Sequence, residues 1–491
     1  MRLGARAAAP PIEADLLSVE FSATALRAAM RDADVETISS DALVKSLGTP
    51  SALSQNTLLN TEALLPRTYT GTNVGVAVID SGVLPSADLN PSLAYDFTTG
   101  VAISVQPRDP FGHGTHVAGL IGSVGLNSKG LYQGIAPGVR LIMLRALDEN
   151  GAGYTSNVIR AIDFAIANKG RFGIDVINLS LGHPPTESAE TDPLVLAVEA
   201  AVRHGIVVVV SAGNVGKNPD TGLVGYAGVL SPATAPSAVT VGAVNTKNTT
   251  SRADDVIPDY SSRGPAMPDA RAKPDLVAPG QRLVSDAAIP STLYDQYPTF
   301  RVSANGASAQ RFMRLSGTSM SAAVTSGVVA LMIEAHRHAF ETALPPNAIK
   351  AALEYSALPL AGYDPLTQGR GSLNAAGAIE LAQAIDPSAP IGSWWTTSPI
   401  APVTMVGSET WPWAQTVVWG NTVVWGNVLY ISEPAWAQTV VWGNTVVWGN
   451  TVVWGNDVVW DDPSTWANTV VWGNTVVWGN TVVWGNKAGS P

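Results

Sequence analysis

The feature that most constrains the fold is the alternation of short Val- and Ile-rich runs with longer helical stretches between residues 54 and 386. Each run is nearly all apolar, which is typical of a strand buried on both faces, and the stretches 158–167 and 193–204 have helical periodicity. Alternating strands and helices predict an α/β fold, with a mostly parallel sheet covered by helices on both faces. Ligands of such sheets bind beyond the carboxyl ends of the strands. The predicted strands are residues 74–79, 140–144, 175–179, 206–210 and 239–244.

Three short segments carry the side chains of nucleophilic catalysis. In chain order they contain Asp80 (Val-Ile-Asp-Ser-Gly), His113 (Gly-His-Gly-Thr-His-Val-Ala-Gly) and Ser319 (Gly-Thr-Ser-Met-Ser). A serine hydroxyl is a weak nucleophile at neutral pH, so an imidazole has to take its proton while a carboxylate fixes the tautomer of that imidazole. The three side chains are therefore candidates for a nucleophile, a general base and an orienting group.

The order Asp, His, Ser and the sequences around these residues resemble the subtilisin-like serine proteases, the subtilase family. The segments 261–265 (Ser-Ser-Arg-Gly-Pro) and 273–280 (Lys-Pro-Asp-Leu-Val-Ala-Pro-Gly) add to the resemblance. It implies that the three residues form a catalytic triad. It also implies that the side-chain amide of Asn214 and the backbone N–H of Ser319 donate hydrogen bonds to the oxyanion.

The resemblance also implies how substrate binds. An extended peptide is expected to pair, main chain to main chain, with two segments of the protease, and glycine lets it come close. One departure from the family pattern concerns the helix after Ser319, where Ala323 and Val324 stand in place of a Pro-His pair. Because proline fixes the backbone early in a helix, we expect activity to survive with a slightly altered placement of the nucleophile. The predicted substrate-binding residues are Gly151, Ala152, Gly153, Ser180, Leu181 and Gly182.

Residues 1–49 resemble part of the inhibitory propeptide that precedes many secreted subtilases, and the similarity centres on residues 26–36. Strand, helix and strand candidates at 17–22, 24–31 and 34–38 indicate half of a small α+β module. An ordinary N-terminal subdomain is the alternative. Prolines and acidic residues interrupt the apolar start, so it is not a usable signal peptide. The resemblance nevertheless implies an extracellular or cell-surface protein.

Composition narrows the range of partners. The net charge of −11 offers no patch suited to a nucleic acid, and the absence of cysteine removes disulfides and thiolate metal sites. No stretch of the sequence is predicted to span a membrane. Calcium is a common structural companion in the family, and Asp88 is the candidate ligand. A lysine, Lys129, in the nearby loop 126–130 counts against that site, because calcium prefers several oxygen ligands.

The composition changes after residue 386. We predict a catalytic domain at 54–386, a linker at 387–410 and a repeat region at 411–491. All 15 tryptophans lie from Trp394 onward, and Thr-Val-Val-Trp-Gly-Asn occurs eight times, with an imperfect ninth copy at 457–462. β-Forming residues followed by Gly-Asn predict an all-β region, either a meander or a β-solenoid.

The sequence thus predicts a secreted serine endopeptidase that acts on proteins or peptides through an acyl-enzyme and requires no cofactor for catalysis. One alternative is an adhesive or assembly protein with a weak or silent protease body, in which the nearly uncharged repeat drives self-association or contact with a cell envelope. A second alternative is an esterase that uses the same acyl chemistry.

Overall fold

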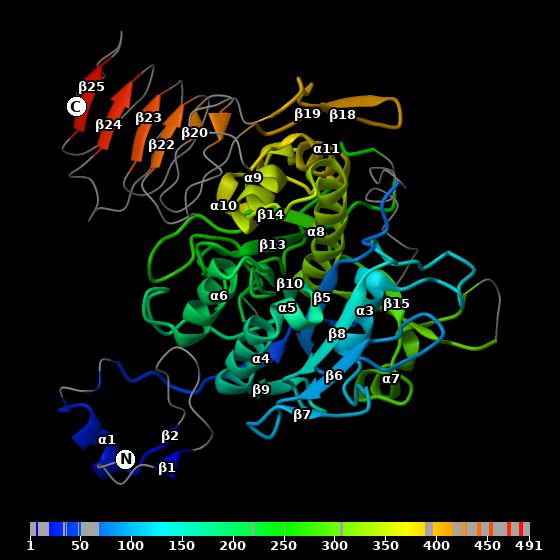
Figure 1. Ribbon diagram of the computed structural model, residues 1–491, viewed down its shortest axis with the longest axis vertical. Coiled ribbons are helices and arrows are strands. Elements are labelled where there is room, and N and C mark those ends of the chain that lie inside the picture. The colour runs from blue at the N-terminus through cyan, green and yellow to red at the C-terminus, as the bar shows by residue number, and fades with distance from the viewer. Residues whose placement is uncertain are drawn as a thin grey trace.

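The computed structural model of the chain describes residues 19–32, 35, 37–47, 68–218, 220–249, 251–304, 308–387 and 396–415, together with the backbone of short strands elsewhere (Figure 1). An eight-stranded sheet forms its centre, in the order β14-β13-β12-β10-β5-β8-β6-β7. Every adjacent pair is parallel except β6 and β7, so the predicted mostly parallel sheet is confirmed. The strands are β5 (Gly75–Asp80), β6 (Leu93–Asp96), β7 (Ile103–Ser104), β8 (Arg140–Arg145), β10 (Ile174–Leu179), β12 (Val207–Ser211), β13 (Val239–Val244) and β14 (Leu276–Pro279).

Helices cover both faces of this sheet, which explains why its central strands are mostly apolar. Side chains alternate along a strand. Val76 and Val78 of β5 therefore enter one core, whereas Ala77 and Ile79 enter the other. The first core is closed by α3 (His113–Gly122), α8 (Thr318–Phe340), α9 (Pro346–Ser356) and α11 (Ala375–Ala384), and the second by α4 (Thr155–Ala167) and α6 (Pro193–Arg203).

Local signals set where these helices begin. Asp192 caps α6 by accepting hydrogen bonds from the N–H groups of Leu194 and Val195, and Pro193 occupies the first helical position. Among the described residues, α8 is the helix long and apolar enough to cross a membrane, and its apolar stretch is wholly buried in the body. The remaining helices are α1 (Ala23–Ala29), α5 (Lys169–Phe172), α7 (Thr292–Gln296), α10 (Pro365–Gln368) and the 3₁₀ turn η1 (Pro298–Phe300).

The N-terminal part contains the helix predicted at 24–31, which the structure places at α1 after the capping residue Ser22. Among the described residues of the first predicted strand, Val19–Glu20 (β2) pair with β1 (Arg6–Ala7), and residues 17–18 lie outside the described part. Residues 37–38 of the second predicted strand are irregular. A strand forms later instead, at β3 (Leu43–Ser46), because it finds partners in the main body.

A second, antiparallel sheet lies beside α3. Its strand β17 (Phe312–Ser316) leads directly into α8 and pairs with three others. One of its partners comes from the N-terminal part of the chain. The partners are β15 (Leu283–Asp286), β16 (Arg301–Val302) and β4 (Thr49–Pro50).

The predicted linker at 387–410 differs from the structure in its second half. An antiparallel hairpin forms there from β18 (Val403–Val406) and β19 (Glu409–Pro412). Trp413, only 3 % exposed, follows it, and its indole N–H donates to the Thr404 hydroxyl at 2.7 Å. The sequence does not indicate this contact, because tryptophan is typical of the repeat region that begins at residue 411.

Short strands recur in the repeat region, and only their backbone is described. The four strands from residue 439 onward pair in parallel, so that Trp442 stands opposite Trp454. Adjacent strands of a meander are antiparallel, so these pairings favour stacked coils. The strands are β20 (Val424–Trp425), β21 (Val428–Leu429), β22 (Thr439–Trp442), β23 (Thr451–Trp454), β24 (Thr469–Trp472) and β25 (Thr481–Trp484).

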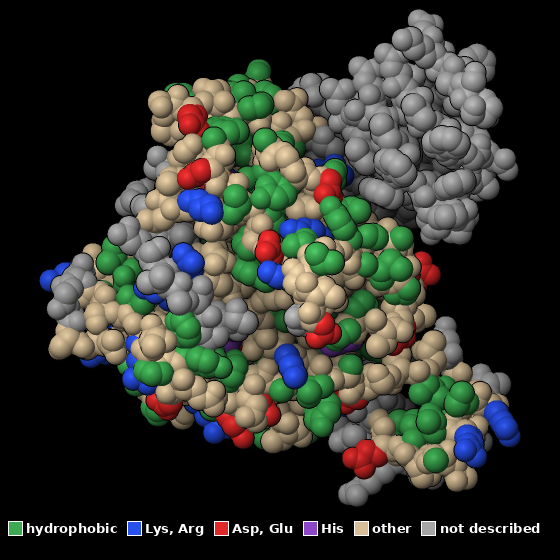
Figure 2. Space-filling model, turned by 180° about the vertical axis from the view of Figure 1, so that it is seen from behind, with side chains coloured by type: hydrophobic (Ala, Val, Ile, Leu, Met, Phe, Trp, Pro, Cys, Tyr) green, Lys and Arg blue, Asp and Glu red, His purple; other side chains and the backbone are tan. Residues whose placement is uncertain are grey.

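The space-filling view shows the opposite face of the molecule. Lys and Arg side chains are scattered there among acidic and apolar ones rather than joined in a continuous basic stripe (Figure 2).

Candidate active site

Asp80 and His113 form a buried pair at the carboxyl end of the central strand. Asp80 is the last residue of β5, His113 is the first of α3, and both are fully buried. The His113 Nδ1–H donates to both carboxylate oxygens of Asp80, at 2.8 and 2.9 Å. A proton on Nδ1 leaves Nε2 as the free acceptor of the neutral ring. Among the described residues Nε2 has no hydrogen-bond partner, so it is available as a base.

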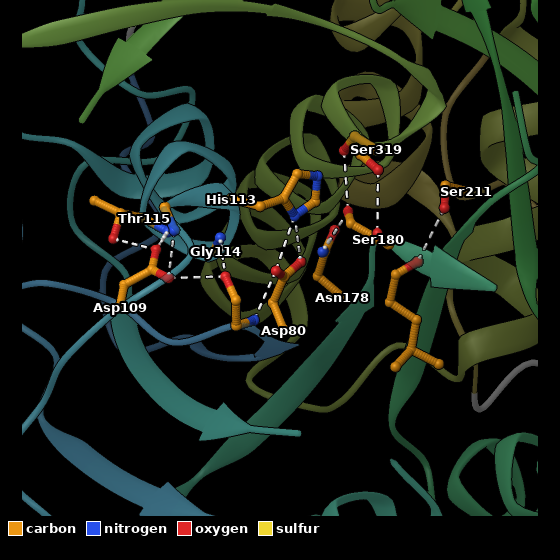
Figure 3. A network of polar contacts seen from close by, with 12 residues as sticks. Asp80, Asp109, His113, Gly114, Thr115, Asn178, Ser180, Ser211 and Ser319 are labelled. Carbon is orange, nitrogen blue, oxygen red and sulfur yellow. Dashed lines mark hydrogen bonds and ion pairs between the residues drawn. The ribbon is translucent and has the colours of Figure 1, made fainter. Parts of the chain in front are cut away.

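Ser319 lies in the first turn of α8, close to the same edge of the sheet. Its hydroxyl donates to the backbone carbonyl of Ser180 at 3.1 Å rather than to His113 (Figure 3). The second ring nitrogen of His113 points away from Asp80, to the side on which Ser319 is drawn (Figure 3). The structure thus brings Asp80 and His113 into direct contact, whereas Ser319, drawn in the same close view, bonds to Ser180 (Figure 3).

Asn214 lies just beyond β12, opposite the start of α8. Its side-chain oxygen accepts hydrogen bonds from the Thr318 N–H and the Thr318 hydroxyl, both at 3.0 Å. These two donors fix the orientation of the amide, so its NH₂ group is turned away from the helix. That NH₂ group donates to the backbone carbonyl of Leu47. The Asn214 amide therefore links the start of α8 to the Leu47 carbonyl.

The predicted substrate-binding segments hold a peptide that belongs to the chain itself. Strand β3 runs antiparallel between β9 (Ala152–Tyr154) and β11 (Leu181–Gly182). Val44 pairs with Gly153, and Lys45 pairs with Ala152 on one side and Gly182 on the other. The ladder continues through the Ser46 N–H to the Gly151 carbonyl at 3.0 Å, and through the Leu47 N–H to the Ser180 carbonyl at 3.3 Å.

Leu47 is the functional residue that sequence reasoning missed. Its N–H and its carbonyl are both engaged, by Ser180 and Asn214. Two residues further on, Thr49 pairs with Ser316 of β17, so the chain is bound on both sides of the Leu47 carbonyl. The only signal in the sequence is indirect, because residues 1–49 resemble the end of a propeptide.

His116 stands one turn along α3 from His113 and has a structural position. Its Nε2 lies 3.2 Å from the Leu283 carbonyl and 3.1 Å from the Met313 carbonyl, so it ties α3 to β15 and β17. Burial, together with the neighbouring His113, lowers the pKa of His116 to about 3. The ring is therefore neutral at working pH and does not compete for the proton of Ser319.

The candidate calcium ligand Asp88 lies beside a second buried acid, Asp286. Each has a carboxylate oxygen with no hydrogen-bond partner among the described residues. Burial and the neighbouring Asp88 raise the pKa of Asp286 to about 7. The side chain of Lys129 is exposed, so it does not fill this space. Two buried, unsatisfied oxygens fit a cation, although the described part of the chain contains no group of three or more His, Cys, Asp or Glu residues arranged to hold one.

Ala323, where the family pattern has proline, is fully buried inside α8. The helix runs without interruption from Thr318 to Phe340. Ser319 is held from the opposite direction as well, because the Ser180 hydroxyl donates to the Ser319 carbonyl at 3.0 Å. The start of α8 is therefore fixed by side chains from the sheet, in the absence of a proline.

Comparison with known proteins agrees with this geometry. The family model described as the subtilase family matches residues 71–378. Serine protease AprX of Bacillus subtilis (strain 168) is 33% identical over 318 residues, which is 64% of this chain and 67% of AprX. Subtilisin E of the same strain is 36% identical over 288 residues, which is 58% of this chain and 61% of subtilisin E.

A solved structure supports the fold alone. It is fervidolysin from Fervidobacterium pennivorans, a keratinolytic enzyme related to subtilisin, with a TM-score of 0.52 at 23% sequence identity. The match covers 69% of this chain and 51% of fervidolysin.

Proposed function

Because the chain belongs to the subtilase family of serine endopeptidases, we propose that it cleaves peptide bonds with Ser319 as nucleophile, His113 as general base and Asp80 as orienting carboxylate. The observation that carries the proposal is the Leu47 carbonyl, held by the Asn214 amide at the end of an extended strand. The Ser319 hydroxyl and the Leu47 N–H both donate to the Ser180 carbonyl, which supports attack by Ser319 on the Leu47 carbonyl.

The proposed reaction begins when the Ser319 hydroxyl leaves Ser180 and gives its proton to His113 Nε2. Its oxygen attacks the carbonyl carbon, and negative charge forms on the carbonyl oxygen. The Asn214 NH₂ group and the Ser319 backbone N–H stabilise that charge; loss of one such donor raises the barrier by about 2.7–4 kcal/mol. His113 then protonates the leaving amine, and water hydrolyses the resulting ester on Ser319.

The proposal includes the substrate class. A peptide that binds as residues 43–47 do would be extended and would bury the side chain corresponding to Val44, which is fully buried in the core with Leu181. The side chain corresponding to Lys45 would face solvent, since Lys45 is exposed. We therefore propose endopeptidase activity on proteins and peptides. The proposed preference is for apolar side chains at the positions of Val44 and Leu47, with little selection at the position of Lys45.

The test is covalent labelling followed by cleavage assays. A fluorophosphonate probe is expected to label Ser319 in the full chain, as read by mass spectrometry of the labelled peptide. An internally quenched peptide containing Leu-Val-Lys-Ser-Leu-Gly is expected to be cut after its second leucine. Labelling of a different serine would contradict the proposed nucleophile. Turnover of a matching ester without turnover of the peptide would favour the esterase instead.

We also propose that residues 1–47 act as a propeptide that occupies the cleft until the bond after Leu47 is cut. Asp41 strengthens this attachment, because its carboxylate accepts hydrogen bonds from the Ser156 N–H at 2.8 Å and the Ser156 hydroxyl at 2.7 Å in the first turn of α4. A segment of this kind is typical of exported subtilases, which supports an extracellular or cell-surface location.

The domain limits and the tail complete the proposal. The catalytic domain spans 54–386, and the hairpin with Trp413 extends its contacts to residue 415. We propose that residues 416–491 form a β-solenoid, supported by the parallel backbone pairing of β22 to β25. Its small number of charged residues suits self-association or contact with a cell envelope, and an adhesive role for it is compatible with an active protease body.

Calcium is proposed as a structural ion bound by Asp88 and Asp286, with no part in the chemistry. We expect EDTA to lower the melting temperature of the full chain by about 5 °C, because an ion that binds only the folded state stabilises it. In Asp88→Asn the effect of EDTA should vanish. Identical melting of the wild-type chain with EDTA and with added calcium would contradict the site.

A further inference from the structure

Asp109, in the loop before α3, has one of the most completely satisfied buried carboxylates in the described chain. It is 2% exposed and accepts four hydrogen bonds. One oxygen accepts from the Ser81 hydroxyl and the Gly112 N–H, both at 2.8 Å. The other accepts from the Thr115 N–H at 2.8 Å and the Thr115 hydroxyl at 2.6 Å. All four donors are uncharged, so the carboxylate serves as a structural hub rather than as half of an ion pair.

These donors belong to the two segments that carry the catalytic pair. Ser81 follows Asp80, and its N–H donates to the Asp80 carboxylate at 2.7 Å. The Ser81 hydroxyl also accepts from the Gly114 N–H at 3.0 Å, directly after His113. The hydrogen bonds therefore close a ring that runs from Asp109 through Ser81 and Asp80 to His113 and back through the first turn of α3 (Figure 3).

The first turn of α3 depends on this carboxylate. Gly112 is the N-cap residue and offers no side chain to cap the helix. The Thr115 N–H would otherwise be a buried donor without a partner, which destabilises a helix start. Asp109 supplies the missing acceptor from outside the helix, and its negative charge suits the positive end of the helix dipole.

The backbones in the ring approach too closely for side chains to intervene. A Cβ on Gly114 would collide with the Gly82 carbonyl, and one on Gly82 would collide with the Arg108 carbonyl. Gly82 also has a φ of 124°, which favours glycine. The three segments around the ring therefore have little room to shift independently, and its hydrogen bonds set their separation.

We propose that Asp109 is a positioning residue that holds the His113 imidazole in register with Asp80, acting through Ser81 and the first turn of α3. The inference rests on the proposed function, because it concerns the base of that reaction. A displacement of about 1 Å in a catalytic group can lower the rate by about a hundredfold. A neutral, isosteric side chain at position 109 should therefore impair catalysis more than binding.

The charged form of Asp109 is the one that fits the ring. Burial raises the pKa of the Asp109 carboxyl above its usual value, and the hydrogen bonds from Thr115, Gly112 and Ser81 limit the rise. Asparagine keeps one acceptor oxygen but turns an NH₂ group toward two donors. Asp109→Asn therefore removes the hydrogen bonds to one side-chain oxygen without changing the volume of the side chain.

The test compares Asp109→Asn with the wild-type chain on the quenched peptide. We expect kcat to fall by about 10- to 100-fold with KM unchanged, because substrate binds to β9 and β11 and not to the ring.

Asp192→Asn is the matched control. Asp192 is also a buried, helix-capping carboxylate, 3% exposed, and it accepts from the Ser231 hydroxyl at 2.6 Å. We expect this control to lower the melting temperature as much as Asp109→Asn does and to leave kcat unchanged. If Asp109→Asn does not fold, Ser81→Ala removes the two hydrogen bonds of the Ser81 hydroxyl, leaves those of Asp109 with Gly112 and Thr115, and is expected to lower kcat by a smaller factor.

A readout without turnover separates this inference from the proposed function. In chains labelled with ¹⁵N-histidine, the proton NMR signal of the His113 Nδ1–H is expected to shift upfield in Asp109→Asn, because its hydrogen bond to Asp80 is weakened. An unmoved signal, or an unchanged kcat with a lowered melting temperature, would overturn the positioning role. An inactive wild-type chain would instead overturn the proposed function and leave the NMR result to decide on Asp109.

Discussion

Replacement of Ser319 by alanine is expected to lower kcat on the quenched peptide by about a million-fold, the magnitude found in subtilisin when the nucleophile is removed. It should also leave the full chain uncut after Leu47. The reason is geometric. The Leu47 carbonyl already accepts a hydrogen bond from the Asn214 amide, so cleavage further requires an oxygen that can attack the carbonyl carbon. Peptide hydrolysis and intact mass of the purified chain would be measured together.

Ser321→Ala is the matched control for this change. Ser321 is a buried serine two residues along α8, and its hydroxyl donates to the Ala278 carbonyl at 2.8 Å. The Ser321→Ala substitution removes one buried hydrogen bond from α8 and leaves Asp80, His113 and Asn214 unchanged. We expect it to retain turnover and to be cut after Leu47. Equal inactivity of the two variants would mean that helix α8, and not the Ser319 hydroxyl, had been tested.

The central sheet could be predicted because its signal is strong and local. The predicted strand at 74–79 is β5 to within one residue, and the predicted strand at 175–179 is β10 to within one residue. Both faces of these strands are buried, so most of their residues are apolar. The placement of Asp80 at a carboxyl end of the sheet follows from the same pattern.

The occupation of the cleft could not be predicted in the same way. The sequence of β3, Leu-Val-Lys-Ser, has no distinctive pattern, and its conformation comes from β9 and β11 on either side. Pairing between strands distant along the chain depends on both partners, so the sequence of one strand does not predict it. The acceptor of the Ser319 hydrogen bond could not be predicted either, since the choice between Ser180 and His113 depends on the rotamer of Ser319 and not on residue types.

Asp109 shows a third limit of sequence reasoning. A lone aspartate in a loop is most often a turn residue, and no spacing marks it as the partner of Ser81 and Thr115. Its function emerges only when the segments after β5 and before α3 are brought together. The same is true of Asn214, for which the family resemblance supplied the role and the structure supplied the two hydrogen bonds from Thr318 that orient it.

Asp80→Asn is expected to lower kcat by about ten-thousand-fold with little change in KM. The Ser81 N–H donates to the oxygen of the side chain at position 80. In the variant this N–H retains the amide oxygen, so the new NH₂ group is turned toward His113 Nδ1. Nδ1 then has to accept a hydrogen bond, and the ring proton moves to Nε2. A protonated Nε2 cannot take the proton of Ser319, so the base is lost although every heavy atom stays in place.

Asp175→Asn provides the comparison that makes this result specific to the tautomer. Asp175 lies near the start of β10, next to the start of β5, whereas Asp80 ends β5. The Asp175 carboxylate accepts from the Gly75 N–H at 3.2 Å and pairs with Arg337 at 2.6 Å. Its loss weakens the sheet, so a lower melting temperature with near-normal kcat is expected. Fluorophosphonate labelling of Ser319 should slow in Asp80→Asn and not in Asp175→Asn. Equal labelling rates in the two variants would contradict a role for Asp80 in setting the proton on His113.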